Sequence, residues 1–437
     1  MESSSSFATL RTMMRWLARA GVALPARPHF MRFWCSDTIS LFGSQITLVA
    51  LPLSAALLLN ARPAQMGLLV ALETIPSLLF ALHAGALVDR ARKVTLIKLG
   101  ALGRGALLLL IPLAASLGVL RMEVIYAVGF LTATLAVFTD VAYQALLPIL
   151  VGRDELVSAN ARLALSESSA DIVGPGLAGV LVQWLSAPFA VMLDALSLFL
   201  SGWLLSTVRV AEASADTRKA TTLVEEIRQG IRAVWDHAIL RWVVCLLAGW
   251  QMLHHMLLAL FVLFALREAG LSPAMVGVAF SFGGLGFLAA SLGVDRMSRN
   301  IGLGPTILAG MCVSALGWEM ISWAPANAER AMLYLSLASA CENCGAGLLF
   351  LSYLSLRQGF TPSALLGRVI ATTRFVTIAA APAGALAGGI LGGAIGLRES
   401  IMLIGSGGIG LAVFATLYSP LKALRSMPAA MPSPGCR

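Results

Sequence analysis

Long apolar stretches separated by short polar turns occupy most of the chain. A helix needs about 20 apolar residues to cross the hydrocarbon core of a bilayer. Six stretches of that length occur in the first half, at residues 33–59, 65–88, 95–118, 124–150, 167–186 and 188–208. Six more follow at residues 240–266, 274–294, 303–324, 331–356, 369–395 and 400–420. The pattern predicts twelve membrane-spanning helices in two groups of six.

The longest internal polar interval, residues 209–239, separates the two groups. Within it, Thr222 and Glu225 have the spacing of a capping box, and Ile227, Ile231 and Trp235 follow at helical spacing, which predicts an interfacial helix. We therefore divide the chain into an N-terminal arm (1–30), an N-terminal six-helix bundle (31–208), a linker with this helix (209–239), a C-terminal six-helix bundle (240–420) and a tail (421–437).

A charged hairpin occurs once in each half. The sequence Gly85-Ala-Leu-Val-Asp89-Arg90-Ala-Arg92-Lys93 returns in degraded form as Ser291-Leu-Gly-Val-Asp295-Arg296-Met-Ser-Arg299, 206 positions later. Each copy follows the second apolar stretch of its group, which indicates a duplication with pseudo-two-fold symmetry. Repeated halves around a central cavity are typical of transporters.

Composition places the chain in a membrane. Of its 437 residues 58% are hydrophobic and only 12% charged, and the mean hydropathy is +0.85. Too few polar groups are present to cover a soluble globule of this size, so the fold class is an all-α integral membrane protein.

Charge sets the expected orientation. If the N-terminus is cytoplasmic, 24 of the 31 Lys and Arg residues fall on the cytoplasmic side, five fall on the other side and two lie within spans. The positive-inside rule then places both termini on the cytoplasmic side of the membrane. Anionic lipid headgroups account for the net charge of +9, so no nucleic-acid partner is expected.

Several segments are interpreted without special chemistry. Residues 1–30 lack the apolar stretch of a secretory signal, so no cleavage is expected. The six cysteines form no extracellular framework, and Cys341 and Cys344, in mid-span, are interpreted as packing residues. We expect no metal and no cofactor. The chain has no Gly-x-x-x-x-Gly-Lys-[Ser/Thr] loop for ATP, so the proton gradient is the expected energy source.

Two motifs resemble elements of the major facilitator superfamily. The hairpin resembles its motif A, at Gly85, Asp89, Arg90 and Arg92, with the second copy at Asp295 and Arg296. The resemblance implies two rocking six-helix bundles with Asp89 in a conformational gate. Ala91 departs from the Gly-Arg of many members.

The second motif lies in the fifth span. Gly174, Pro175 and Gly179 resemble motif C, the Gly-Pro element of family antiporters, which implies export. Proline removes a helix hydrogen bond and glycine permits close approach, so the element is interpreted as a hinge or a kinked packing surface. The Arg-x-x-Gln-Gly pattern of many drug/proton antiporters is missing from the fourth span.

Further segments are similar to one bacterial branch of the superfamily, which contains the enterobactin exporter and related efflux proteins. They are Phe138 to Pro148, Ser158-Ala-Asn160, Thr361 to Val369 and Ala381 to Gly389. The resemblance covers about residues 30–420 and implies export of siderophores, drugs or other amphipathic metabolites across the bacterial inner membrane, where the protein is therefore expected.

Ionisable residues within membrane spans cost several kcal/mol unless they face a cavity or a partner, so they are candidate functional residues. The candidates for proton coupling or the substrate cavity are Asp37, Glu73, Asp140, Asp171, His255, Glu342, Arg374 and Trp250. A proton-coupled exporter needs a carboxylate whose proton affinity changes between dry and wet states of the cavity. Arg374 is expected to bind an anionic group or to neutralise Glu342, and His254 and His255 point about 100° apart, so at most one faces the cavity.

The sequence therefore predicts a proton-driven exporter of a small amphipathic molecule. Its partners are the substrate, protons and membrane lipids, and we expect a monomer. Uptake by proton symport and a non-transporting sensor or scaffold are the alternatives. An enzyme is disfavoured because neither a Glu-x-x-His nor a His-x-x-x-His pair occurs in the spans.

Overall fold

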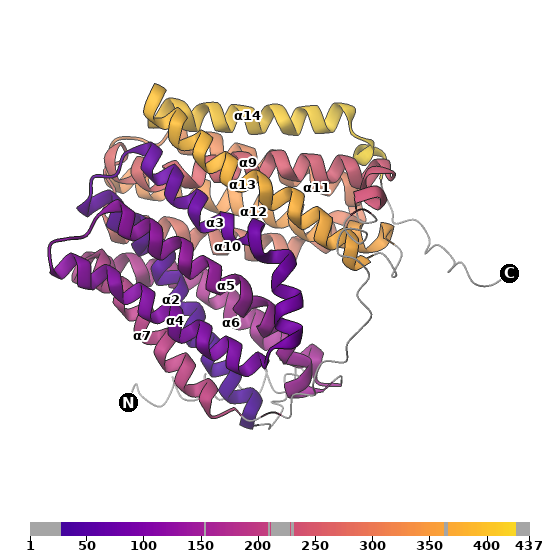
Figure 1. Ribbon diagram of the computed structural model, residues 1–437. Helices are drawn as coiled ribbons and strands as arrows, with labels where there is room; N and C mark the ends of the chain where they lie inside the picture. The colour runs from indigo at the N-terminus through magenta and orange to yellow at the C-terminus, as the bar shows by residue number, and fades with distance from the viewer. Residues whose placement is uncertain are drawn as a thin grey trace, which may run out of the picture.

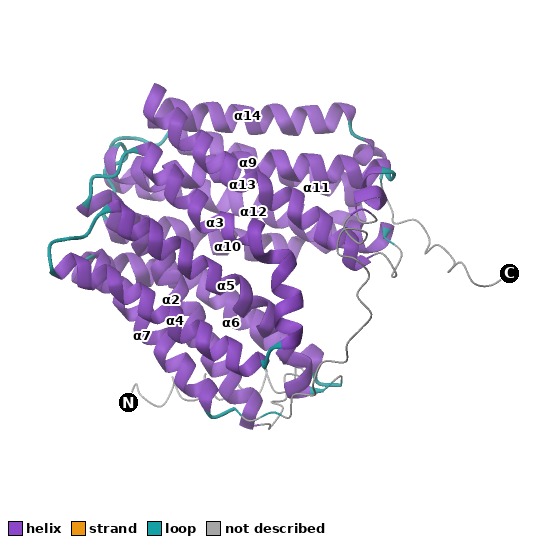
Figure 2. Cartoon of the chain, viewed as in Figure 1, coloured by secondary structure: helices purple, strands orange, loops and turns teal. Residues whose placement is uncertain are grey.

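The structure is a computed structural model that describes residues 28–152, 154–208, 210, 228, 231–361 and 366–424. Within these residues the regular elements are helices, without strands (Figure 2). Twelve of the helices have 20 residues or more and one short 3₁₀ helix ends the described chain. The all-α fold class and the expected twelve helices are confirmed.

The first half consists of α2 (Pro28–Leu58), α3 (Pro63–Arg90), α4 (Lys93–Ser116), α5 (Met122–Val151), α6 (Leu156–Leu185) and α7 (Ala187–Ser206). The second half consists of α9 (Ala238–Arg267), α10 (Pro273–Ile301), α11 (Leu303–Ser322), α12 (Ala328–Phe360), α13 (Leu366–Ile395) and α14 (Leu397–Tyr418), followed by η1 (Pro420–Ala423). Most of the expected interfacial helix, with Thr222 and Glu225, lies outside the described residues, as do residues 1–27 of the expected arm.

Local signals start and end these helices. Pro63 and Pro273 stand in the first turn of α3 and α10, where a missing N–H costs nothing. Asn327 caps α12 by accepting a hydrogen bond from the backbone N–H of Arg330 at 3.1 Å. The helices extend beyond the predicted apolar stretches because their end turns are polar.

Helix α6 is the polar exception among the spans. Eleven helices in the described part of the chain are long and apolar enough to cross a membrane by composition, and α6 is not among them. It carries Arg162 and Glu167 in its first half and Asp171 at its middle, and it begins eleven residues before the predicted stretch. It packs between α2 and α10, inside the molecule, which shelters these side chains from lipid.

The twelve helices form two bundles, one from each half of the chain (Figure 1). In the first bundle α2 packs on α6 and α7, and α4 and α5 complete the ring with α3. In the second bundle α12 packs on α10 and α11, while α9 contacts α13 and α14. The bundles meet through two main helix pairs, α3 with α13 and α6 with α10.

Backbone conformation preserves the duplication. Asn60 and Gly270, 210 positions apart, have positive φ of 48° and 67° in the turns after the first helix of each bundle. Ser186 and Gly396, again 210 positions apart, join the last two helices of each bundle with φ of 76° and 100°. Equivalent turns therefore keep the same unusual backbone although their residue types differ.

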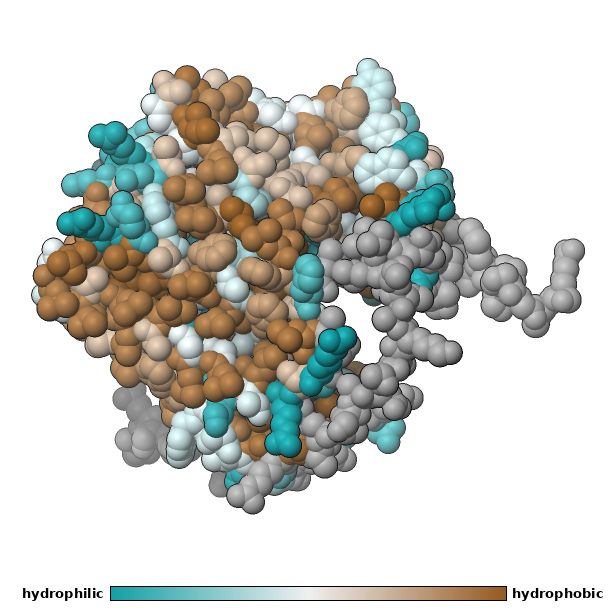
Figure 3. Space-filling model, in the orientation of Figure 1, coloured by the Kyte–Doolittle hydropathy of each residue, from teal (hydrophilic) through white to brown (hydrophobic). Residues whose placement is uncertain are grey.

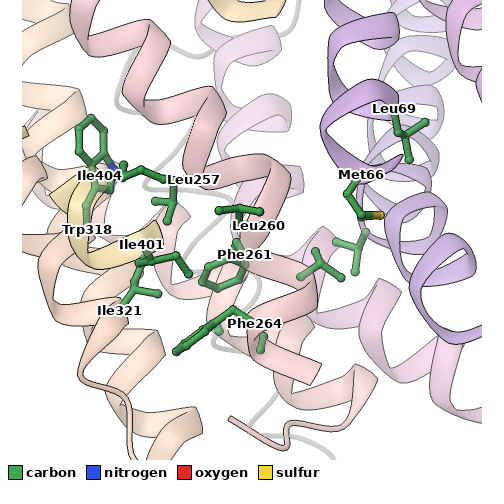
Figure 4. Close-up of a cluster of buried hydrophobic side chains, with 14 of the residues drawn as sticks. Met66, Leu69, Leu257, Leu260, Phe261, Phe264, Trp318, Ile321, Ile401 and Ile404 are labelled. Carbon is green, nitrogen blue, oxygen red and sulfur yellow. The ribbon is translucent and has the colours of Figure 1, made fainter. Parts of the chain in front are cut away.

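A continuous apolar core joins both bundles. It includes Met66 and Leu69 of α3 together with Leu257, Leu260, Phe261 and Phe264 of α9 (Figure 4). Trp318 of α11 is fully buried beside α14. On the outer surface, apolar side chains cover the flank and hydrophilic ones gather toward the two ends (Figure 3). Leu292 and Ile390 are among the exposed apolar residues, as expected for contact with lipid.

Gly384, Gly388 and Gly392 recur at every fourth position of α13 and form a stripe along one face of this helix. Added Cβ atoms at Gly384 and Gly388 would lie 2.1 Å and 2.6 Å from backbone atoms of Met252 and Met256 on α9. The stripe therefore holds α13 close to a helix of its own bundle. Gly389, on a neighbouring face, contacts the first bundle instead.

Candidate functional site

A cavity of about 600 Å³, here called the central cavity, lies between the bundles. Its wall combines α2 and α6 of the first bundle with α9, α10 and α12 of the second. Among the described residues that line it are three carboxylic acids and one histidine, and none is lysine or arginine: Glu167, Asp171, Glu342 and His254. Phenylalanines line much of the remaining wall.

Glu342 and His254 are in hydrogen-bonding contact at the edge of this cavity. His254 Nδ1 lies 3.0 Å from Glu342 Oε1, and the side chains are 28% and 10% exposed. Behind the histidine, Trp250 stacks on its ring at 5.0 Å between centroids, nearly parallel. The Trp250 indole N–H donates to Ser314 Oγ at 3.3 Å. The tryptophan thus holds the imidazole in place and is itself 9% exposed, so it supports the site from behind.

Two other sequence candidates lie apart from the wall of the central cavity. His255 Nδ1 is 2.9 Å from the backbone carbonyl of Gln251, which accepts its hydrogen bond, and it is His254 that lines the cavity. Glu73 on α3 packs toward Gly129 of α5. The structure therefore brings together Glu342 and Asp171 from the predicted set, with His254 added.

A second hollow, here called the side pocket, lies within the first bundle and has a volume of about 420 Å³. Asp37 of α2 and Asp140 of α5 line it, with Tyr143 beside Asp37. The basic neighbours of Asp140 are Arg104 of α4 and Arg374, which reaches in from α13 of the second bundle. Arg374 therefore lies beside Asp140, whereas Glu342 is paired with His254.

The two hollows share one residue, Glu167 of α6. Asp171 lies one helical turn further along the same face and accepts a hydrogen bond from Gln45 Nε2 at 2.5 Å. Glu167 interacts electrostatically with Asp171 on one side and with Asp37 on the other. A row of acids therefore connects the central cavity with the side pocket.

Sequence reasoning missed Asp194 on α7, which is 1% exposed. Thr47 donates to its Oδ2 at 2.5 Å and Ser197 donates to its Oδ1 at 3.2 Å. Arg104 is its basic neighbour. A single acid in the otherwise apolar stretch 188–208 was the available signal, and its partners identify it as a structural residue.

The motif A residues lie at the ends of α3 and α10. Arg90 and Arg92 are exposed, and an added Cβ at Gly85 would meet nothing within 4 Å. The Asp89 side chain lies outside the described part of the structure. In the second copy Arg296 is exposed and Asp295 pairs with Arg299 one turn away on its own helix. The second copy therefore makes a local ion pair on α10.

The motif C residues lie where α6 meets α10. An added Cβ at Gly179 would be 2.5 Å from the Pro273 carbonyl oxygen, and one at Gly277 would be 2.3 Å from the Pro175 carbonyl oxygen. Gly174 faces Gln45 of α2. The Gly176 N–H donates to Ser281 Oγ at 2.9 Å across the boundary. The element forms a tight contact between the bundles.

One face of the molecule is closed by such contacts. Gly67 and Gly389 repeat the Gly277–Gly179 contact with a shift of 210 positions, because the Cβ of Gly389 would meet Gly67 Cα at 2.9 Å. Arg267 donates to the Ala61 carbonyl at 2.9 Å on the same face. We call this the closed face. The central cavity extends from it toward Ser291 and Phe350, on the side where the described chain begins and ends.

Two six-helix bundles related by pseudo-symmetry around a shared cavity define a transporter architecture. The family model described as Major Facilitator Superfamily matches residues 33–381. The chain belongs to this superfamily of membrane transporters.

Two curated relatives are similar over most of their length. An uncharacterized MFS-type transporter of Sinorhizobium fredii, y4rN, is 28% identical over 406 residues, covering 90% of this chain and 95% of the relative. The multidrug efflux pump Tap of Mycolicibacterium fortuitum is 28% identical over 397 residues, covering 87% and 93%.

Solved structures share the fold. The crystal structure of the nucleoside transporter NupG gives a TM-score of 0.72 at 9% identity, covering 88% of this chain and 98% of that one. A bacterial homologue of the human lysosomal transporter Spinster, in an inward-facing and occupied conformation, gives 0.67 at 12% identity, covering 92% and 97%.

Proposed function

We propose that the protein is a secondary active transporter that exports a small amphipathic molecule by alternating access in antiport with protons. The observation that carries this proposal is the central cavity, which places a buried carboxylate, Glu342, between two bundles that are closed on one face only. Such a cavity offers a substrate and a proton a common site that is accessible to one side at a time.

Proton coupling is supported by the position of Glu342. Desolvation favours the neutral form of a carboxyl group, and hydration favours the charged form. A carboxyl group in the wall between two rocking bundles changes its hydration with each cycle, and therefore its affinity for a proton. The acids that continue through Glu167 to Asp37 offer protons further sites toward the side pocket.

Two observations support the proposed direction of transport and the proposed location of the protein. Tap is a multidrug efflux pump, and the similarity covers 93% of its length. The charge distribution favours cytoplasmic termini in a bacterial inner membrane, which makes the open side of the cavity the cytoplasmic side. The substrate classes that fit an exporter of this kind are siderophores, drugs and secondary metabolites.

The test is ligand-driven proton movement in proteoliposomes that enclose a pH dye, challenged with siderophores, dyes and antibiotics under an imposed proton gradient. Ligand-dependent proton flux that Glu342→Gln abolishes is the expected result. Glu329→Gln is the matched control, because Glu329 is exposed in the first turn of the same helix.

The same assay separates the rival functions. Protons and ligand that move in the same direction would identify a symporter. Ligand binding without any ligand or proton movement, in vesicles of known orientation, would identify a sensor.

A further inference from the structure

The central cavity has a one-sided charge. Its described lining carries Glu167, Asp171 and Glu342, while the two arginines near the site, Arg104 and Arg374, belong to the side pocket. A ligand in the central cavity therefore meets three acids and a histidine without meeting a permanent positive charge. Burying an anion in such surroundings is costly, whereas a cation gains a counter-ion.

Aromatic rings line the rest of the same cavity. Phe261 of α9 and Phe280 of α10 are in edge contact, 4.9 Å between centroids, and Phe287 and Phe350 extend the wall. Ring faces attract organic cations and also bury apolar groups. The combination of acids and phenyl rings matches a ligand that is both positively charged and apolar.

We propose that the central cavity binds an amphipathic organic cation, and that this cation replaces His254 as the counter-ion of Glu342. The proposal rests on the proposed function in one respect, since it takes the central cavity as the transport site. It excludes anionic siderophores as ligands of this cavity.

The geometry makes His254 the competitor of the cation. Its Nδ1 lies 3.0 Å from Glu342, and Trp250 supports the opposite side of its ring. Because the carboxylate is 10% exposed and the imidazole 28%, a ligand approaches Glu342 beside His254. When His254 is protonated it neutralises Glu342. Binding of a cation therefore requires His254 to lose its proton or to move away.

Other titratable groups face this pair and enter the same balance. His255 contacts the His254 ring edge-on from α9, and Cys341 lies close to Glu342 on α12. Glu167 and Asp171 face it from α6 across the cavity. In the described lining, α2 and α10 contribute neutral side chains only.

Competition with a proton predicts weaker cation binding in acid. A proton on His254 disfavours the cation, so the affinity for the cation should rise as the pH rises. Protonation of the carboxyl groups would also weaken binding of the cation as the pH falls. Replacing the histidine by a neutral residue separates the two effects.

The experiment uses two probes of equal shape and opposite charge, tetraphenylphosphonium and tetraphenylborate. Their binding to the full-length protein in lipid nanodiscs is measured by equilibrium dialysis against protein-free nanodiscs. We expect the cation to bind about tenfold or more tightly than the anion, a difference of about 1.4 kcal/mol. Glu342→Gln should remove most of this preference, and Glu329→Gln should leave it unchanged.

His254→Gln tests the competition. The wild type should bind the cation more weakly as the pH falls, and the variant should lose the part of this pH dependence that a proton on His254 causes. Equal binding of the two probes by the wild-type protein would overturn the substrate class without any variant. An unchanged pH dependence in a folded His254→Gln protein would overturn the counter-ion role.

The binding assay uses no proton gradient, so its result does not depend on whether the protein is an antiporter. Cation binding without proton movement in the vesicle assay would disprove antiport and leave this inference standing. Proton-coupled movement of neutral or anionic ligands that compete for the cavity would disprove the inference and leave the exporter standing.

Discussion

At the scale of single residues, the intramembrane acids divide into two kinds. Asp194 accepts two hydrogen bonds and has Arg104 beside it, so its charge is satisfied within the first bundle. Glu342 is hydrogen-bonded to a titratable side chain, His254, and has a cavity in front of it. A satisfied buried charge stabilises one arrangement, whereas a charge with an exchangeable partner can serve a cycle.

Asp194→Ala tests the structural role. The change leaves Thr47 without its acceptor in a buried site, while Ser197 still donates to the backbone carbonyl of residue 194, so we expect a loss of about 1–3 kcal/mol of stability. The measurement is the thermal midpoint of the purified protein by size-exclusion chromatography after heating. Asp194→Asn keeps an acceptor oxygen and should lose less. If Asp194→Ala melts like the wild type but fails to transport, Asp194 belongs to the transport mechanism instead.

The sequence predicted acids at the site, but it did not show which of two adjacent histidines lies beside them. Charged groups inside apolar stretches must find partners or cavities, so Asp171 and Glu342 could be named from sequence. The choice between His254 and His255 depends on the rotation of α9 about its axis. That rotation is set by contacts with α13 and α14, which a single sequence does not reveal.

At the scale of helices and turns, hydropathy located all twelve helices, because an apolar segment that crosses lipid can adopt few structures other than a helix. It placed the start of α6 too late, since the charged first half of this helix is sheltered by its neighbours. Hydropathy does not predict the backbone geometry of the turns. The equivalence of Ser186 and Gly396 became visible only through their shared backbone conformation.

Ser186→Gly should stabilise the protein. Ser186 has φ 76° and ψ 159°, a region that is essentially confined to glycine and costs another residue about 1–3 kcal/mol. Gly396 has φ 100° and ψ 162° at the equivalent turn. We expect a gain of about 1 kcal/mol, because the flexibility of glycine in the unfolded chain offsets part of the relief. Thermal melts of Ser186→Gly and Ser186→Ala measure it, and only the glycine variant should gain.

At the scale of the whole molecule, repeated halves predict the fold but leave its conformational state open. Both states of such a transporter use the same helices and differ in which face of the bundle pair is closed. Here the closed face is formed by Gly67 with Gly389 and Gly179 with Gly277, four glycines in a symmetric pair of contacts. These contacts are formed between residues distant in the chain, so the sequence offered only the glycines themselves.

One-sided access predicts one-sided labelling. Ser168 lies exposed in the wall of the central cavity, so a Ser168→Cys variant should react with an impermeant thiol reagent from the open side only. The background protein should carry serine in place of all six native cysteines, so that only the introduced thiol reacts. Labelling in inside-out vesicles but not in right-side-out vesicles is the expected result. Arg121→Cys, at the exposed turn before α5, should show the reverse preference.

Gly389→Ala should shift the molecule away from this state. The added Cβ would lie 2.7 Å from the Pro63 carbonyl oxygen and 2.9 Å from Gly67 Cα, and these backbone atoms of α3 cannot move without separating the bundles. Gly393→Ala is the matched control, because a Cβ there, one turn along α13, meets nothing within 4 Å. Compared with glycine, alanine favours the helix by about 1 kcal/mol at either position, so the difference between the variants reports the contact alone.

We expect Gly389→Ala to slow labelling of Ser168→Cys from the open side and to allow labelling from the closed side. Transport should fall about tenfold, a change of about 1.4 kcal/mol. Equal labelling and transport in the two alanine variants would show that the closed face is held by something other than its glycine contacts.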